Sequence, residues 1–130
     1  MIDHITIGVA NFARSTAFYD QVCAPLGASR LITMTEDGVD IAGYGDTQPW
    51  LWLVAERPTT GLLHVALRAP NWAGVDGFHA AAIAAGGMDN GAPGLRPHYH
   101  PDYYAAFFLD PDGHNIEAVC HSPQAPTHPK

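Results

Sequence analysis

The sequence contains few cations: Lys and Arg number only 6 against 13 Asp and Glu, and the formal net charge is −7. The only Lys is residue 130. A chain with so little positive charge offers no basic patch to a phosphate backbone or an anionic lipid surface. We therefore predict no nucleic acid partner and no membrane partner.

Long apolar runs and leader features are also missing. The longest apolar run, residues 103–109, is far too short to span a bilayer. Residues 1–4 show neither the cationic nor the apolar region of a signal peptide. This pattern predicts a cytoplasmic protein.

Nucleophiles are scarce as well. The two cysteines, Cys23 and Cys120, form no metal-spaced CxxC pair, and without a signal sequence they are predicted to be buried thiols. None of the serines lies in a G-x-S-x-G setting, and no internal Lys is available for a Schiff base or a phosphate loop. Any catalysis must therefore rest on His and acidic residues.

An internal repeat organises what is present. Residues 3–28 align with residues 63–88 without a gap, so that His4 matches His64 and Asn11 matches Asn71. Each copy reads as an alternating strand, an Asn that suits a helix N-cap, and an apolar pattern at helical spacing that ends at a Gly. The repeat predicts a strand followed by a helix, twice.

Further strands are predicted after each helix, three of them after the first. In the first copy they cover residues 28–35, 39–45 and 49–55. The second copy ends with strands at 103–109 and 114–119 around the turn "DPDG", and residues 91–102, rich in Gly, Pro and His, are predicted to form a loop.

The predicted class is α+β, with two βαβββ modules and helices on the outer face. With 47% hydrophobic residues in a chain of 130, one domain is expected. We place this domain at 1–121, its modules at about 1–57 and 61–121, and a disordered tail at 122–130.

Alternation along the strands brings three polar residues to one face. If Ile5 and Ile7 face the helices, His4 faces the opposite way, and the same parity places His64 and Glu117 with it. A single strand His is more often structural, and a carboxylate after a turn is usually solvated. Together, however, two His and one carboxylate from three strands predict a site for Fe(II), Mn(II), Zn(II), Co(II) or Ni(II).

Four segments resemble the vicinal oxygen chelate superfamily, which includes glyoxalase I, fosfomycin-resistance transferases, extradiol dioxygenases and bleomycin-resistance proteins. The resemblance covers residues 2–121, and its carriers are "DHITIGV" at 3–9, "AFY" at 17–19, "LHVAL" at 63–67 and "DPDGHNIE" at 110–117. It implies a curved mixed sheet around a cleft, with His4, His64 and Glu117 as metal ligands. A divalent metal would chelate neighbouring oxygens of a small substrate and stabilise the anion formed from it.

The sequence departs from each subgroup in a specific way. Trp52 stands where glyoxalase I carries a fourth ligand, which favours a three-ligand site. Only Arg68 and Arg96 could surround the phosphonate of a fosfomycin-type substrate. His100 or His98 has the spacing of the extradiol histidine, but Phe107 replaces the tyrosine of that pattern.

We therefore expect a metal-dependent lyase, isomerase or dioxygenase of this type, with a homodimeric assembly implied by the resemblance. The alternative is a metal-free binding protein that sequesters a small molecule, as bleomycin-resistance proteins do. We assign acid–base roles to His98 and His100. The predicted substrate-binding residues are Trp50, Trp52, Arg68, Arg96 and Tyr103.

Overall fold

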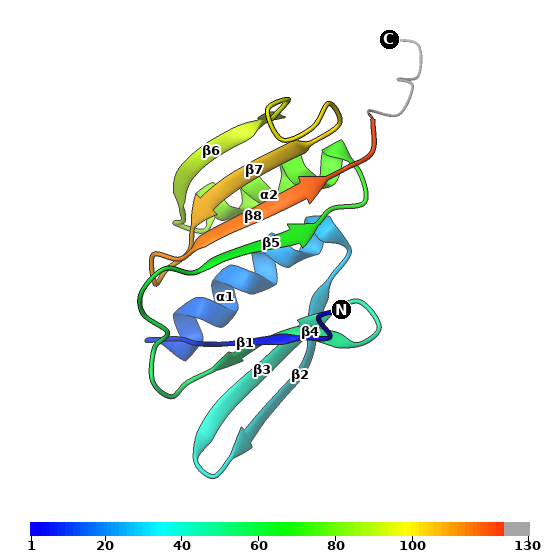
Figure 1. Ribbon diagram of the computed structural model, residues 1–130. Coiled ribbons are helices and arrows are strands. Elements are labelled where there is room, and N and C mark those ends of the chain that lie inside the picture. The colour runs from blue at the N-terminus through cyan, green and yellow to red at the C-terminus, as the bar shows by residue number, and fades with distance from the viewer. Residues whose placement is uncertain (124–130) are drawn as a thin grey trace.

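Both copies of the repeat fold into the same βαβββ unit in the computed structural model, which describes residues 1–123 (Figure 1). The first module contains β1 (Ile5–Gly8), α1 (Phe12–Cys23), the short 3-10 helix η1 (Ala24–Leu26), β2 (Ser29–Glu36), β3 (Val39–Gly45) and β4 (Pro49–Val54). The second contains β5 (His64–Arg68), α2 (Trp72–Ala84), β6 (Met88–Leu95), β7 (Tyr104–Leu109) and β8 (Asn115–Cys120). The predicted α+β class and the two modules are confirmed. From residue 124 on, the predicted tail 122–130 lies outside the described residues.

The strands form two four-stranded mixed sheets. Their orders are β1-β4-β3-β2 and β5-β8-β7-β6, with β1 parallel to β4 and β5 parallel to β8. In the described chain, β1 and β5 each pair with one strand only, so each keeps one edge unpaired. Figure 1 shows α2 behind the second sheet and α1 in the space between β5 and β1. Within residues 1–123, no helix has the length and apolar character needed to cross a membrane.

The predicted Asn caps start both helices. The Asn11 Oδ1 accepts a hydrogen bond from the Arg14 amide at 3.0 Å, and the Asn71 Oδ1 accepts one from the Gly74 amide at 2.8 Å. Each cap satisfies a backbone donor that the first helical turn leaves without a partner. Repetition of this cap is why both helices leave their strands in the same way.

The two modules pack through their helical sides. Phe18 of α1 and Phe78 of α2 both contact the fully buried Phe108 of β7, with ring centroids 5.3 and 4.7 Å away. Gly77 of α2 leaves room for η1, since a β-carbon there would lie 2.9 Å from the Pro25 side chain. One hydrophobic core therefore joins both modules and sets their relative orientation.

The turn before β8 also ties the modules together. The buried Asp110 carboxylate accepts hydrogen bonds from the amides of Asp112 and His114, both at 2.9 Å, and from the Tyr19 hydroxyl of α1 at 2.6 Å. Its neighbour Asp112 accepts a hydrogen bond from Arg14 at 3.3 Å. The "DPDG" motif thus shapes its own turn and holds the first module through α1.

One expectation about the second module is wrong. Residues 91–95 belong to β6, so the loop predicted at 91–102 begins only at Arg96. The register of β6 against β7 shifts twice, on either side of Gly91. A bulged strand carries no clean alternation, which is why its sequence resembles that of a loop.

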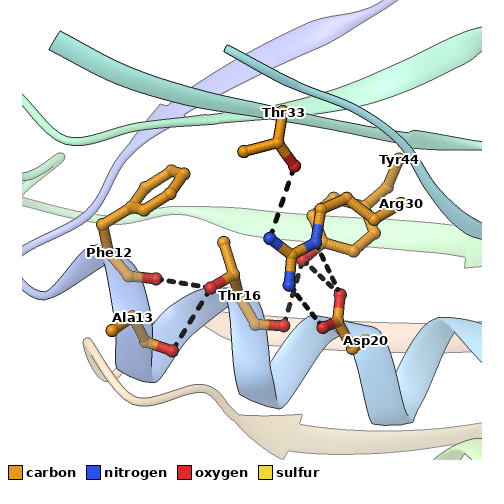
Figure 2. Close-up of polar contacts among 7 residues, drawn as sticks. All are labelled: Phe12, Ala13, Thr16, Asp20, Arg30, Thr33 and Tyr44. Atoms are coloured by element: carbon orange, nitrogen blue, oxygen red, sulfur yellow. Dashed lines mark hydrogen bonds and ion pairs between the residues drawn. The ribbon is translucent and has the colours of Figure 1, made fainter. Parts of the chain in front are cut away.

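A polar network attaches the hairpin β2–β3 to α1 (Figure 2). Arg30 donates to both oxygens of Asp20, at 3.1 and 2.5 Å. The Tyr44 hydroxyl lies 2.9 Å from the Asp20 Oδ1 and 3.0 Å from the Thr16 carbonyl. Burial, followed by the hydrogen bond to Asp20, raises the pKa of Tyr44. Its hydroxyl therefore remains a hydrogen-bond donor over the physiological range.

Both cysteines are buried and unbonded, as predicted. Burial raises the pKa of Cys23 from 9.0 to about 12, and burial also raises the pKa of Tyr104 from 10.0 to about 12. When folding raises the pKa of a group, the stability of the protein is unaffected by that group below its unfolded-state pKa. Stability then falls as the pH rises from the unfolded-state pKa to the folded-state pKa.

We expect the protein to lose stability on the alkaline side. The unfolded thiol and phenols ionise near 9.0 and 10.0, whereas the folded state holds Cys23 and Tyr104 protonated up to about 12. Urea denaturation at pH 7.5 and at pH 10.5 measures the difference, with a lower midpoint expected at pH 10.5. Cys23→Ala should reduce this pH dependence, and an unchanged midpoint would contradict the linkage.

Candidate functional site

Glu117 lies on the face of the second sheet that points away from the helices. It is opposite Ala66 of β5 and Phe107 of β7 in the strand register, and only 1% of it is exposed. The Nε2 atom of His64 lies 2.7 Å from the Glu117 Oε1. Two of the three predicted ligands are therefore in direct contact, as the parity of β5 and β8 predicts.

Tyr103 occupies the other oxygen of the same carboxylate. Its hydroxyl donates a hydrogen bond to the Glu117 Oε2. Burial, then this hydrogen bond and the charge of Glu117, raise the pKa of Tyr103. Tyr103 therefore stays protonated and donates to Glu117, a role beyond the substrate contact predicted for it.

His4 lies apart from this pair. Its Nδ1 is 2.6 Å from the Asp3 carboxylate, and about half of its side chain is exposed. It lines a groove of about 490 Å³ over the first sheet, together with Trp52. In residues 1–123, no three His, Cys, Asp or Glu side chains come together closely enough to hold a metal ion.

A single chain brings together two of the three protein ligands predicted for the metal. An imidazole nitrogen and a carboxylate oxygen, 2.7 Å apart on neighbouring strands, suit a borderline divalent metal. The third nearby donor, the protonated Tyr103 hydroxyl, is a poor ligand. A site with three protein ligands needs one more side chain beside His64 and Glu117.

A pair of histidines lies next to Tyr103. The His100 Nδ1 accepts a hydrogen bond from the Asp102 amide at 3.1 Å, so its Nε2 carries the proton and donates to the His121 Nδ1 at 2.8 Å. The Tyr103 ring contacts both imidazoles, with centroids 5.4 and 5.2 Å away. His100 therefore touches the site only through the Tyr103 ring, and its Nε2 is engaged by the hydrogen bond to His121.

His121 is not among the site residues predicted from the sequence. Its position, two residues beyond Val119 and four beyond Glu117, has the parity of the Glu117 face. That alternation was the available signal. It could not show that the loop before β7 returns His100 to the end of β8.

The remaining predicted residues are distributed over two surfaces. Trp50 and Arg68 line a groove of about 1040 Å³ between β1 and β5, where His64 also lies. Trp52 lies in the other groove with His4. It pairs with Thr6 in the first sheet, the position equivalent to that of Glu117 beside Ala66 in the second sheet. The two tryptophans thus do not share one pocket.

The two residues from the loop sequence also differ in position. The Arg96 guanidinium lies over the ring of Phe107, 5.4 Å from its centroid, on the face of Glu117. His98 is exposed and packs on Tyr99, with centroids 4.2 Å apart. No hydrogen bond or ion pair in the described chain joins His98 to Glu117.

Solved structures share this architecture. A glyoxalase/bleomycin resistance protein from Albidiferax ferrireducens is 27% identical, with a TM-score of 0.75, and the match covers 90% of this chain and 96% of that one. A glyoxalase/bleomycin resistance protein/dioxygenase family enzyme from Burkholderia phytofirmans is 19% identical, with a TM-score of 0.68, over 93% and 98% of the two chains.

A longer protein shows the same fold in part of its chain. A glyoxalase I variant from Zea mays is 23% identical, with a TM-score of 0.69, over 91% of this chain but 46% of the maize chain. A comparison with curated proteins finds no match.

The family comparison covers most of the sequence. The family described as "Glyoxalase/Bleomycin resistance protein/Dioxygenase superfamily" matches residues 1–118. This match includes both modules except the last two residues of β8, and it contains the His64–Glu117 pair and the "DPDG" turn. The chain therefore belongs to the glyoxalase/bleomycin resistance protein/dioxygenase superfamily.

Proposed function

We propose that the protein is a metal-dependent enzyme of the vicinal oxygen chelate type, a lyase, isomerase or dioxygenase for a small oxygenated substrate. The observation that carries the proposal is the contact of 2.7 Å between the His64 Nε2 and the buried Glu117. Burying a carboxylate is costly unless a cation or several hydrogen bonds compensate it. An anionic ligand poised beside an imidazole is one use that justifies this cost.

His4 of a second copy completes the proposed ligand set. The shared core and the Asp110–Tyr19 hydrogen bond hold the two modules of one chain in an arrangement that leaves His4 in its own groove. The unpaired edges of β1 and β5 are surfaces at which a second chain can add. In a twofold dimer this addition occurs twice and yields two equal sites.

The side chains have separate tasks in this proposal. A bound divalent metal supplies Lewis acidity toward two neighbouring substrate oxygens. His64 and Glu117 hold it, and Tyr103 keeps the second carboxylate oxygen occupied, which limits Glu117 to one ligating oxygen. His100 and His121, hydrogen-bonded to each other at 2.8 Å beside the Tyr103 ring, are the imidazoles that can exchange protons with substrate and solvent.

Two variants should fail in different ways. Glu117→Gln removes the anionic ligand, so the protein purified without chelators should contain little metal and show no turnover. His100→Ala should keep its metal while turnover falls by about 10²–10⁴, the usual contribution of an acid–base group. Metal analysis of the wild type and both variants, with turnover on the same substrate, provides the test.

Two results would contradict this assignment. Wild-type protein that retains none of Fe, Mn, Zn, Co and Ni, even when they are added, would exclude the metal site. A His100→Ala variant that loses its metal as readily as Glu117→Gln would show that His100 is not a proton-handling residue.

A metal-free binding protein is the second candidate function. It is favoured by the absence of a three-ligand cluster within residues 1–123 and by the hydrogen bond from Tyr103 to Glu117. In that case the groove of about 1040 Å³ would hold an apolar or aromatic molecule. The metal analysis above separates the two candidates.

A further inference from the structure

We infer that Arg96 is an anchor for a carboxylate of the substrate, so that the substrate class is an oxygen-chelating carboxylic acid. This inference rests on the proposed function, because it assumes that the chelating oxygens lie at His64 and Glu117. It adds the charge of the substrate and the residue that recognises it.

The guanidinium of Arg96 is held by neutral acceptors. Its Nη1 donates to the Gly94 carbonyl at 2.8 Å, and its Nη2 donates to the Ala92 carbonyl at 2.9 Å. These bonds use two of the five N–H groups of an Arg side chain and leave three. The group is fixed in place and still has donors for a ligand.

The backbone of β6 is shaped around this group. A β-carbon at Gly94 would lie 3.2 Å from the Arg96 Nη1, and one at Gly91 would lie 3.2 Å from the Nη2 and 3.0 Å from the Phe107 ring. Gly91 also has a φ of +147°, which other residues rarely adopt. The bulges and the two glycines therefore form a cradle for the guanidinium.

The cradle lies beside the His64–Glu117 pair. Arg96 lies over the Phe107 ring, whose centroid is 5.9 Å from that of His64. Phe107 is also the β7 partner of Glu117. A substrate beside Phe107, between Arg96 and His64, would thus reach Arg96 with one end and the His64–Glu117 pair with the other.

Arg96 has no carboxylate partner among the described residues. Arg14 pairs with Asp112 and Arg30 pairs with Asp20, whereas Arg96 forms no ion pair in this part of the chain. Among the described residues Arg57 and Arg68 also form no ion pair, but of these three only Arg96 has its guanidinium held in place by two backbone carbonyls. A fixed cation that packs on an aromatic ring without an internal counter-ion is suited to an anion from outside.

A carboxylate fits this site better than a phosphonate. The planar guanidinium matches the two oxygens of a carboxylate in a paired arrangement, and one Arg balances its single charge. A doubly charged phosphonate needs further cations, and the exposed Arg68 of β5 is the only other Arg predicted to contact substrate.

The test compares probes that carry the same chelating hydroxyls with and without the acid. Catechol, 2,3-dihydroxybenzoate and 3,4-dihydroxybenzoate are titrated into the metal-loaded protein by calorimetry at pH 7. We expect at least one of the acids to bind about 10- to 100-fold more tightly than catechol, the range of a charge-assisted pair. Such a preference opposes the overall negative charge of the protein, and because the bound metal is also a cation, only its loss in Arg96→Gln assigns it to Arg96.

Variants assign the preference to Arg96. Arg96→Gln should bring the acids to the affinity of catechol and leave catechol within about twofold of wild type. Arg96→Lys should keep part of the preference, since Lys retains the charge without the fork. Arg57→Gln, which removes an exposed charge elsewhere, should keep the whole preference. Thermal denaturation identifies any variant that has lost its fold.

Three outcomes overturn the inference. Equal binding of all three probes by the wild type would exclude an anion anchor, and so would an unchanged preference in folded Arg96→Gln. Tighter binding of 3,4-dihydroxyphenylphosphonate than of either acid would show that the site prefers a phosphonate to a carboxylate.

A failure of the metal site can be told apart from these results. If the wild type retains no metal, benzoate and benzamide are compared on the metal-free protein. A preference for benzoate of about tenfold that Arg96→Gln abolishes supports the anchor without the metal. Equal affinities overturn it.

Discussion

A mixture of His4→Ala and Glu117→Gln chains is expected to bind metal, although neither variant binds it alone. The two chains are refolded together so that mixed dimers form. In a mixed dimer, the intact His4 of the Glu117→Gln chain meets the intact His64 and Glu117 of the other chain. About half of the dimers are mixed and each regains one of its two sites, so about a quarter of all sites should fill.

The matched control combines His64→Ala with Glu117→Gln. Both residues belong to the same half-site, at a distance of 2.7 Å, so mixing these chains leaves every site defective. Metal content after gel filtration distinguishes the two mixtures. If the first mixture binds as little metal as the control, the site does not combine His4 of one chain with Glu117 of another.

A separate measurement tests the predicted homodimer. Light scattering of the refolded wild type should give a mass of about twice 13.9 kDa. A monomer at tens of micromolar would exclude a shared site.

Phe108→Ala should cost about 3–5 kcal/mol of unfolding free energy, a large part of the roughly 5–15 kcal/mol typical of a domain. Phe108 has no exposed surface and contacts Phe18 of the first module and Phe78 of the second. Truncation leaves a cavity where both helices meet the sheet. Urea denaturation measures the loss, and both modules should unfold in a single transition.

The neighbouring Phe107 provides the control. It is only half-buried and lies on the opposite face of the sheet, beside its partner Glu117. Phe107→Ala should therefore lose less than half of what Phe108→Ala loses. Equal losses, or separate transitions for the two modules, would show that Phe108 is not the joint between them.

Local rules account for most of what the sequence predicted. The matched pairs His4 and His64, and Asn11 and Asn71, identified the repeat, because a strand and a capped helix depend on contacts between near neighbours. Alternation along β8 predicted that Glu117 shares a face with His64. Both results follow from the periods of 2 and 3.6 residues, which are visible in one chain.

Other features depend on residues far apart in the sequence. The continuation of β6 to Leu95 involves bulges and the hydrogen bonds from Arg96 to two carbonyls of the strand. No local sequence pattern predicts either feature. The hydrogen bond between His100 and His121 depends on the path of a loop. Long-range contacts of this kind have no period for the sequence to show.

The separation of His4 from His64 and Glu117 is the clearest division between the two levels. By itself, the sequence determined the repeat, the α+β class and the face on which each ligand candidate lies. Only the tertiary structure decided that His64 and Glu117 meet while His4 stays in another groove. The physical reason is that parity sets the face of each strand, whereas the packing of α1 and α2 through the shared core sets the angle between the sheets.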